Sequence, residues 1–256
     1  ENYDKNVHIR EKYQSRENFL SILQLKDKLY ADIDLATGTG KSYVMYGIAR
    51  ICLGIGLVER VLILCPSLTI ESALMEKFTS LSADENLLRK VPTSAKVKNP
   101  SIISANQTIE KGQICIENIH AVYQTTGSSI RDSFLGTGGD TLILNDESHH
   151  IFNTPSGNST DASSIKKWKS FLLDSEYGFK YMLGFTGTAY ISDEYFPDVI
   201  YRYSLKEAIE QKIIKNVDYV KEDDSASTEE KFQKILNNHI NNSNQFPNTI
   251  EVLEKY

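Results

Sequence analysis

The sequence predicts an α/β fold in which helices cover both faces of a mostly parallel sheet. Short apolar runs such as Arg60–Cys65 and Thr141–Asn145 lack polar alternation, which is typical of strands buried on both faces. These runs alternate with helix-like segments, an order that favours right-handed crossovers between parallel strands. Ligands of such sheets bind beyond the carboxyl ends of the strands, so we expect the functional residues there.

The N-terminal half alternates helix and strand patterns. Residues 1–28 are rich in charge but carry spaced apolar residues, which indicates a helix ahead of the first strand. We expect that strand at Tyr30–Leu35, a helix at Tyr43–Leu53, and after the strand Arg60–Cys65 another helix at Ser67–Leu81. The apolar residues expected on the inner face of helix 43–53 are Val44, Ile48, Ile51 and Cys52.

The C-terminal half continues the pattern and then changes character. Further strands are expected at 101–104, 114–119, 141–145 and 180–185. A polar segment at Asn153–Ser163 predicts a loop, followed by a helix at Ile165–Leu173. Beyond a polar linker that starts at Glu222, a capping-box pattern at Ser227 predicts one more helix, whereas asparagine-rich residues 237–248 favour a loop.

Composition limits the function classes. Of the 256 residues, 40% are hydrophobic and 24% are charged, as in ordinary globular proteins. A net charge of −6 gives no overall attraction to nucleic acid or anionic lipid. Cysteines 52, 65 and 115 lie in apolar runs, which favours buried, reduced thiols. With no apolar run of spanning length and no signal peptide, we expect a cytoplasmic protein without membrane contact. Because the chain starts at Glu1, we expect a fragment.

A glycine-containing segment links the first expected strand to the helix at 43–53. Residues 36–42 read ATGTGKS, and strand, glycine loop and helix form the context of a phosphate-binding loop. Leu35 stands where the strict pattern has glycine, so the match is to the TGxGK[ST] variant. Gly38 and Gly40 let the backbone approach a ligand at the positive end of the helix. ATP is expected to contact Thr37, Gly38, Thr39, Gly40, Lys41 and Ser42.

An acidic pair closes the strand at 141–145. A carboxylate in that position can hold Mg²⁺ together with the Ser42 hydroxyl, and Asp146 is placed for this. Glu147 can then accept a proton from an attacking water. Because phosphoryl transfer asks the protein mainly to position groups and neutralise charge, Lys41, Asp146 and Glu147 are the expected catalytic residues.

The order of these motifs resembles the first RecA-like lobe of superfamily 2 DEAD/DEAH-box helicases. It is most similar to the Res subunit of type III restriction enzymes, over roughly residues 9–216. The segments that carry the resemblance are ATGTGKS at 36–42, LCPS at 64–67, DESHH at 146–150, TGTA at 186–189 and YSLKEAI at 203–209. The first and third together are specific, whereas LCPS and TGTA are weak alone.

The resemblance implies a role for each matching residue. Lys41 would bind the β and γ phosphates, Ser42 and Asp146 would hold Mg²⁺, and Glu147 would activate water. The residues implied to couple nucleotide state to nucleic-acid grip are His149, Thr186 and Thr188. The remaining implied contacts are Gln14 to adenine, and Pro66 and Ser67 to a nucleic-acid backbone. The implied partners are duplex DNA, a second RecA-like lobe, and a nuclease or methyltransferase subunit.

Simpler interpretations stay open for some of these residues. Gln14 can be a surface glutamine, and Ser67 can simply cap a helix. His149 and His150 can pack or bind a metal, although no third ligand is spaced nearby. Ser148 stands where the family usually has alanine, and TGT replaces the usual motif at 186–188.

The expected organisation has three parts. Residues 1–28 form an N-terminal helical segment, residues 29–216 form the ATP-binding lobe, and residues 217–256 lead toward a second lobe. That lobe supplies the family's arginine finger, so we expect this chain alone to bind ATP but to hydrolyse it poorly. The alternatives to a DNA helicase or translocase are an RNA helicase of the DEAD/DEAH class and a nucleotide-binding interaction switch with little turnover.

Overall fold

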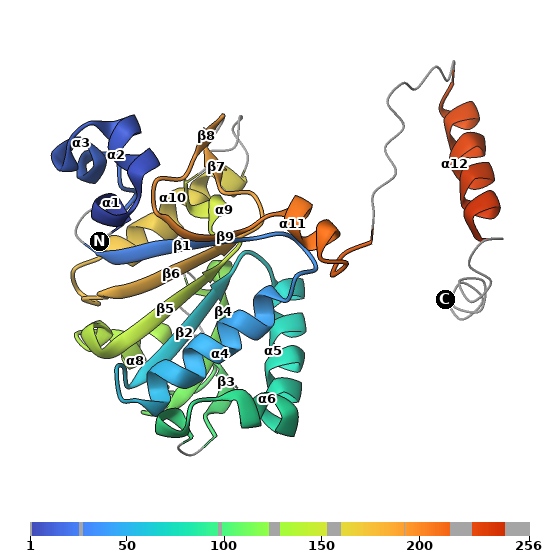
Figure 1. The fold of residues 1–256 in the computed structure, drawn as a ribbon. Coiled ribbons are helices and arrows are strands. Elements are labelled where there is room, and N and C mark those ends of the chain that lie inside the picture. Colours follow the sequence, from blue (N-terminus) through green and yellow to red (C-terminus); the bar gives the residue numbers. More distant parts are fainter. Residues whose placement is uncertain are drawn as a thin grey trace. The chain divides into compact units, whose positions relative to one another are not determined.

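A computed structural model describes residues 2–25, 28–96, 99–122, 129–152, 160–191, 193–215 and 227–243. Among them, seven strands form one sheet in the order β3-β4-β2-β5-β6-β1-β9, and every adjacent pair is parallel. The strands are β1 (Leu29–Leu35), β2 (Arg60–Cys65), β3 (Ser101–Ser104), β4 (Gln113–Asn118), β5 (Thr141–Asp146), β6 (Tyr181–Thr186) and β9 (Val199–Tyr203). The predicted mostly parallel α/β fold is therefore confirmed (Figure 1).

Helices cover both faces of this sheet (Figure 1). One face packs against α4 (Lys41–Gly54) and α5 (Leu68–Ala83), and α6 (Glu85–Lys90) follows α5. The helices on the other face are α7 (Ile119–Val122), α8 (Ile130–Phe134), α9 (His149–Phe152) and α10 (Thr160–Leu173). Two 3₁₀ turns, Thr93–Ala95 and Gly138–Asp140, and a hairpin of β7 (Tyr190–Ile191) and β8 (Glu194–Tyr195) complete this part of the described chain.

Alternate residues of each central strand enter two separate cores. Ile63 of β2 packs beneath α4 and α5, whereas its neighbours Leu62 and Leu64 face α8 and α10. This two-sided burial explains why the strand is apolar throughout. On α4 the buried residues are Met45, Tyr46, Ala49 and Arg50. Of the expected face, Ile48 and Cys52 pack partly buried against this core, whereas Val44 is 37% exposed and the prediction was wrong for it. The buried face is instead centred on Met45, Tyr46 and Ala49, and Tyr46 packs edge-to-face on Phe78 of α5.

The N-terminal segment differs from the expected single helix. Within residues 2–25 it forms three short helices: α1 (Asn2–Lys5), α2 (Val7–Tyr13) and α3 (Arg16–Ser21). The breaks occur where Asn6 and Ser15 cap the following helices by accepting backbone N–H groups with their side chains. Local capping thus outweighs the longer apolar pattern.

Two expected loops are partly helical. Helix α10 starts at Thr160, so residues 160–163 are not loop, and residues 153–159 lie outside the described part. Helix α12 (Thr228–Ser243) starts after Ser227, whose side chain accepts the Glu230 N–H. It continues through asparagine residues that we expected in a loop, because a well-capped amphipathic helix tolerates weak helix formers at its end. Residues 244–248 and the linker at 222–224 lie outside the described part.

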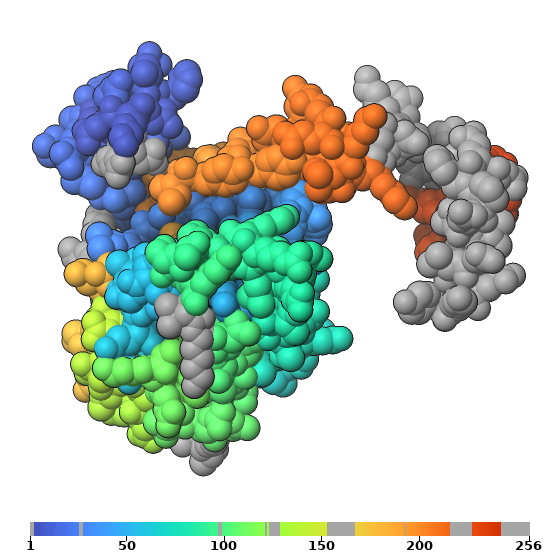
Figure 2. All heavy atoms as spheres, turned by 60° about the horizontal axis from the view of Figure 1, so that its bottom comes forward, coloured from blue at the N-terminus to red at the C-terminus, as the bar shows by residue number. Residues whose placement is uncertain are grey.

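Two elements were not predicted: the strand β9, which joins the sheet, and the helix α11 (Leu205–Glu210), which follows it. Strand β9 pairs with β1, and Ala36 donates its N–H to the Tyr203 carbonyl directly after this pairing. In Figure 2 this orange segment runs along a blue region, the colour of β1, with which β9 pairs. The run VIYRY at 199–203 is rich in β-branched and aromatic residues, the signal that could have predicted it.

The chain separates into two compact units, residues 1–214 and residues 215–256. Cys65 and Cys115 are buried and Cys52 is half-buried, and all three are free thiols. None of the described helices has the length and apolar character needed to cross a membrane.

Candidate nucleotide-binding site

Three adjacent strands bring the sequence motifs to one edge of the sheet. Strand β6 lies between β5 and β1, with Thr186 opposite Asp34 and Phe185 opposite Asp146. The glycine loop follows β1, the Asp146–Glu147 pair ends β5, and residues 186–188 end β6. Because the strands are parallel, these segments share the carboxyl edge, where ligands bind in sheets of this kind.

The loop that follows β1 has the backbone of a phosphate-binding loop. Gly38 and Gly40 have φ values of 83° and 96°, in the region that favours glycine. The Thr39 hydroxyl donates to the Ala36 carbonyl at 2.6 Å, which closes the turn on itself. Helix α4 then begins at Lys41 with no side-chain cap, so its first backbone N–H groups are available to an anion.

Lys41 joins the loop to the acidic pair. Its ammonium lies 2.9 Å from Asp146 Oδ1 and contacts Glu147 Oε1. Asp146 is 4% exposed, and burial raises the pKa of its carboxyl while the Lys41 charge opposes that rise. Burial alone would lower the pKa of Lys41, but Asp146 and Glu147 outweigh it and the pKa is raised. The cluster is therefore a compact arrangement of opposite charges in which Asp146 is buried and Lys41 and Glu147 are partly buried.

The imidazole of His149 lies between Glu147 and the end of β6. Its Nδ1 is 3.5 Å from Glu147 Oε2 and 2.9 Å from the Thr186 hydroxyl oxygen. That oxygen also accepts the Thr188 N–H at 3.0 Å. Burial and the neighbouring His150 lower the pKa of His149, which favours a neutral ring at pH 7. A continuous polar path thus runs from the acidic pair to residues 186–188.

The acidic edge fits a divalent cation. Asp146 Oδ1 is buried and accepts no hydrogen bond of good geometry, although the Lys41 ammonium is near it. Carboxylate and hydroxyl oxygens are the ligands that Mg²⁺ prefers, and Ser42 is the second residue of α4, one position beyond Lys41. In the described part of the chain, no group of three or more His, Cys, Asp or Glu side chains is arranged as a metal site.

Comparison with known proteins identifies the family. The family described as "Type III restriction enzyme, res subunit" matches residues 8–191. The chain belongs to this family. The Res-type resemblance of the motifs is thereby confirmed, and the parallel sheet with helices on both faces is the RecA-like lobe that the resemblance implied. No relative was found among the curated proteins.

Two solved structures show weaker likeness to this Res-family chain. A nuclease-deletion mutant of the Type ISP restriction-modification enzyme LlaGI, in complex with a DNA substrate mimic, has 14% identity and a TM-score of 0.48 over 79% of this chain. This chain spans 20% of that one. The UvsW helicase from bacteriophage T4 has 16% identity and a TM-score of 0.38, covering 74% of this chain and 67% of UvsW. Likeness at this level does not bear on function.

Not all of the expected site residues of this Res-family lobe meet at the carboxyl edge. Gln14 is exposed at the end of α2 with a φ of 60°, and Figure 1 shows α1–α3 at the amino end of β1. Its role as an adenine reader stays a prediction. Pro66 and Ser67 do follow β2 at the carboxyl edge, and the Ser67 side chain accepts the Ile70 N–H at 3.4 Å and caps α5. The expected nucleic-acid contact of these two residues also stays a prediction.

Sequence reasoning missed a buried polar group beside the acidic pair. The Ser148 hydroxyl donates to Asp32 Oδ1 at 2.6 Å, and the Tyr30 hydroxyl donates to Asp32 Oδ2 at 2.7 Å. Asp32 and Ser148 are both fully buried. Polar residues that alternate with apolar ones in a strand usually face solvent, so the run YADIDL concealed this contact. The one available signal was glycine inside β6, which indicates close approach of neighbouring groups.

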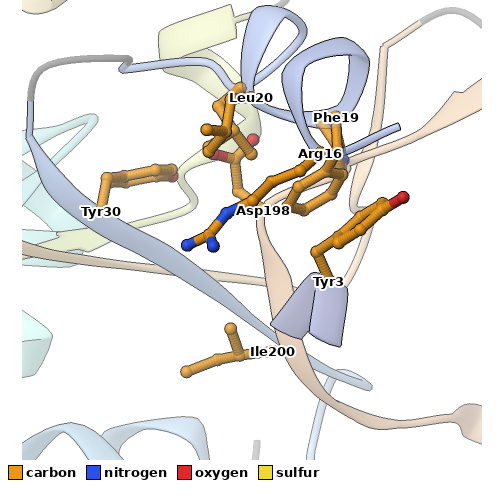
Figure 3. Close-up of a pocket in the computed structure, with 9 residues that line it drawn as sticks. Tyr3, Arg16, Phe19, Leu20, Tyr30, Asp198 and Ile200 are labelled. Atoms are coloured by element: carbon orange, nitrogen blue, oxygen red, sulfur yellow. The ribbon is translucent and has the colours of Figure 1, made fainter. Parts of the chain in front are cut away.

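Tyr30 also borders a cavity away from the loop. This cavity has a volume of about 190 Å³ and lies between the N-terminal helices and the segment that enters β9. Figure 3 shows Tyr3 and Phe19 on one side and Tyr30 on the other, with the Arg16 side chain extending between them. Its lining is largely apolar, so it does not resemble a triphosphate site.

Proposed function

We propose that this chain is the ATP-binding motor lobe of an ATP-dependent DNA helicase or translocase of the Res type. One observation carries the proposal: Lys41 of the glycine loop contacts both Asp146 and Glu147. Residues separated by over a hundred positions thereby meet at the carboxyl edge of β1 and β5. That is the arrangement a phosphoryl-transfer site needs, because charge neutralisation and positioning supply most of the catalysis.

Each residue has a defined part in this proposal. Backbone N–H groups of residues 37–40 and the start of α4 cradle the phosphates. Lys41 leaves its carboxylate partners and neutralises the outer phosphates, while Ser42 and Asp146 hold Mg²⁺. The bound ion would supply charge neutralisation at the phosphate oxygens. Glu147 orients the attacking water and accepts its proton.

His149 and the end of β6 are suited to transmit the nucleotide state. The ring of His149 contacts both Glu147 and Thr186, and Thr186 in turn holds the Thr188 N–H. A change in the position of Glu147 on hydrolysis would therefore alter residues 186–188. We propose that this path acts on a groove shared with a second lobe, which would also supply an arginine worth about 10³-fold or more in rate.

Duplex DNA is the proposed nucleic-acid partner, because the family that matches is that of a restriction enzyme subunit. An RNA helicase would share the same two nucleotide motifs, and a switch protein would bind nucleotide with little turnover. Neither alternative is favoured by a separate observation. We expect such a lobe to work together with a nuclease or methyltransferase subunit. We also expect the protein to be cytoplasmic.

Steady-state ATP hydrolysis by the full-length protein tests this proposal. We expect duplex DNA to raise kcat more than an RNA duplex of the same length does. Equal or greater stimulation by RNA would favour the RNA helicase alternative. No stimulation by either, with intact ATP binding, would favour the switch. A Lys41→Ala variant, assayed in parallel, should show no hydrolysis under any of these conditions.

A further inference from the structure

Glu147 has an unusual backbone conformation that requires support. Its φ is 52°, in the left-handed region that non-glycine residues seldom occupy. Such conformations persist when the surrounding contacts over-determine them. The residues that hold the chain on either side of Glu147 therefore decide where its carboxylate lies.

Ser148 is the support on the C-terminal side. It is fully buried, its backbone N–H donates to the Phe185 carbonyl at 3.0 Å, and its hydroxyl donates to Asp32 at 2.6 Å. The first contact joins it to β6, and the second joins it across β6 to β1. Ser148 is thus hydrogen-bonded to both β6 and β1, and it directly follows Glu147, whose carboxylate contacts Lys41.

The Asp32 carboxylate accepts two hydroxyl hydrogen bonds and, within the described part of the chain, has no charged partner to compensate it. It is fully buried and makes no ion pair with a Lys or Arg among the described residues. Its two oxygens take the hydroxyl groups of Ser148 and Tyr30. An unpaired buried carboxylate costs stability, so its presence calls for a function.

The contact also depends on Gly184 of β6. A Cβ on Gly184 would lie 2.7 Å from Ser148 Cβ and nearer still to Asp32 Oδ1. Strand β6 therefore leaves an opening where the side chains from β1 and from the segment after β5 meet. Strands β1 and β6 and the segment after β5 thus all contribute to this contact, which favours a role in positioning over incidental packing.

A second aspartate of β1, Asp34, also accepts a tyrosine hydroxyl and provides a contrast. Tyr195 donates to Asp34 Oδ2 at 2.7 Å, the same distance as in the Tyr30–Asp32 pair. Arg202 lies 3.4 Å from the same carboxylate and compensates its charge. The hydrogen bonds and ion pairs of Asp34 involve residues near β9, not the segment 147–149.

We propose that Asp32 positions the water-activating Glu147 by holding the Ser148 hydroxyl. The inference rests on the proposed function, because it assigns Glu147 its role in hydrolysis. Asp32 and Ser148 are positioning residues in this account, since both are fully buried and act through Glu147. The Tyr30 hydroxyl fixes the second oxygen of Asp32 and so orients the first toward Ser148.

DNA-stimulated ATP hydrolysis by the full-length protein tests the proposal. Ser148→Ala and Asp32→Ala should each lower kcat about tenfold, because misplacing a catalytic group by a fraction of an ångström is enough for such a loss. The KM for ATP should stay within twofold, because the loop and Lys41 are untouched. Asp32→Asn keeps an acceptor oxygen for Ser148 and should retain kcat within twofold.

Tyr195→Phe is the matched control, since it removes an equal hydrogen bond from the other aspartate of β1. It should leave kcat within twofold of the wild-type value. Wild-type kcat in Ser148→Ala, an equal loss in Tyr195→Phe, or a loss in Asp32→Asn as large as in Asp32→Ala would each overturn the proposal. Ser148→Ala removes one oxygen and leaves the packing intact, and its melting curve shows whether it folds. Loss of ATP binding in Lys41→Ala tests the nucleotide site separately, so the two failures are distinguishable.

Discussion

Two buried aspartates on the strands that flank β6 are held in opposite ways. Asp146 ends β5 beside the Lys41 ammonium, which compensates its charge. Asp32 lies inside β1 and has only hydroxyl partners among its hydrogen bonds. Burial raises the pKa of Asp32 to about 6, although its hydrogen bonds to Ser148 and Tyr30 oppose that rise. In the proposed account the first carboxylate meets a ligand, whereas the second holds a neighbouring residue.

The surroundings of the two aspartates explain why the sequence predicted a role for Asp146 but not for Asp32. Asp146 and Glu147 close an apolar strand downstream of ATGTGKS, a pattern that has few other interpretations. The convergence of Lys41 with the acidic pair was predicted on that basis, while the apolar runs predicted the central strands and the parallel sheet. The contact of Asp32 with Ser148 depends on strand order and on Gly184 of the strand between them. Such tertiary contacts leave no periodic signal in a single sequence, so Asp32 was missed.

Capping and edge pairing account for other differences. Asn6 and Ser15 divide the N-terminal segment into short helices, although its apolar residues suggested one helix. Strand β9 joins the sheet through its pairing with β1, which local patterns could suggest but not place. The positions of element ends and edges were thus less predictable than the buried central strands.

The largest effect is expected when Glu147, the proposed acid–base group beside Lys41 and Asp146, is replaced. Glu147→Gln in the full-length protein keeps the shape of the side chain but cannot accept a proton from water. We expect kcat for ATP hydrolysis to fall by about 10²- to 10⁴-fold, with ATP binding retained. Wild-type turnover in this variant would remove Glu147 from its proposed role.

The next largest effect comes from crowding the contact between Asp32 and Ser148. Gly184→Ala would place a methyl group against Asp32 and Ser148, and overpacking of this kind costs about 1–3 kcal/mol of unfolding free energy. Urea denaturation measures this loss. Gly139→Ala is the control, because a Cβ there meets nothing within 4 Å. Equal stability of the two variants would show that β6 tolerates a side chain at this position.

The pH dependence of stability sharpens the comparison. Since the pKa of Asp32 is raised from 3.8 to about 6, its contribution to stability is fully present below pH 4. That contribution is lost as the pH rises through about 6. Asp32→Asn should therefore raise the unfolding free energy by about 1–3 kcal/mol at pH 7.5.

The stability difference between Asp32→Asn and the wild type should shrink as the pH falls toward 4. Some pH dependence should persist in the variant, because burial also raises the pKa of Asp198 to about 7 and that of Glu117 to about 7. Denaturant titrations of both proteins at several pH values measure these terms. A constant difference across the range would contradict the raised pKa of Asp32.

The smallest expected effect concerns Ser67, which contacts neither Asp146 nor Asp32. Ser67→Ala removes the cap of α5 and should cost about 1 kcal/mol of unfolding free energy. If Ser67 also contacts a nucleic-acid backbone, the variant should bind duplex DNA more weakly than Ser15→Ala, which removes the cap of α3. Equal DNA binding by the two variants would leave Ser67 with its structural role alone.

Calorimetric titration of this chain with ATP and Mg²⁺ tests the central claim most directly. The wild type should bind one nucleotide, and Lys41→Ala should weaken binding by about a hundredfold or more, because a desolvated charge that faces the phosphates is lost. Unchanged affinity in Lys41→Ala would contradict the assignment of the carboxyl edge of β1 and β5 as the nucleotide site.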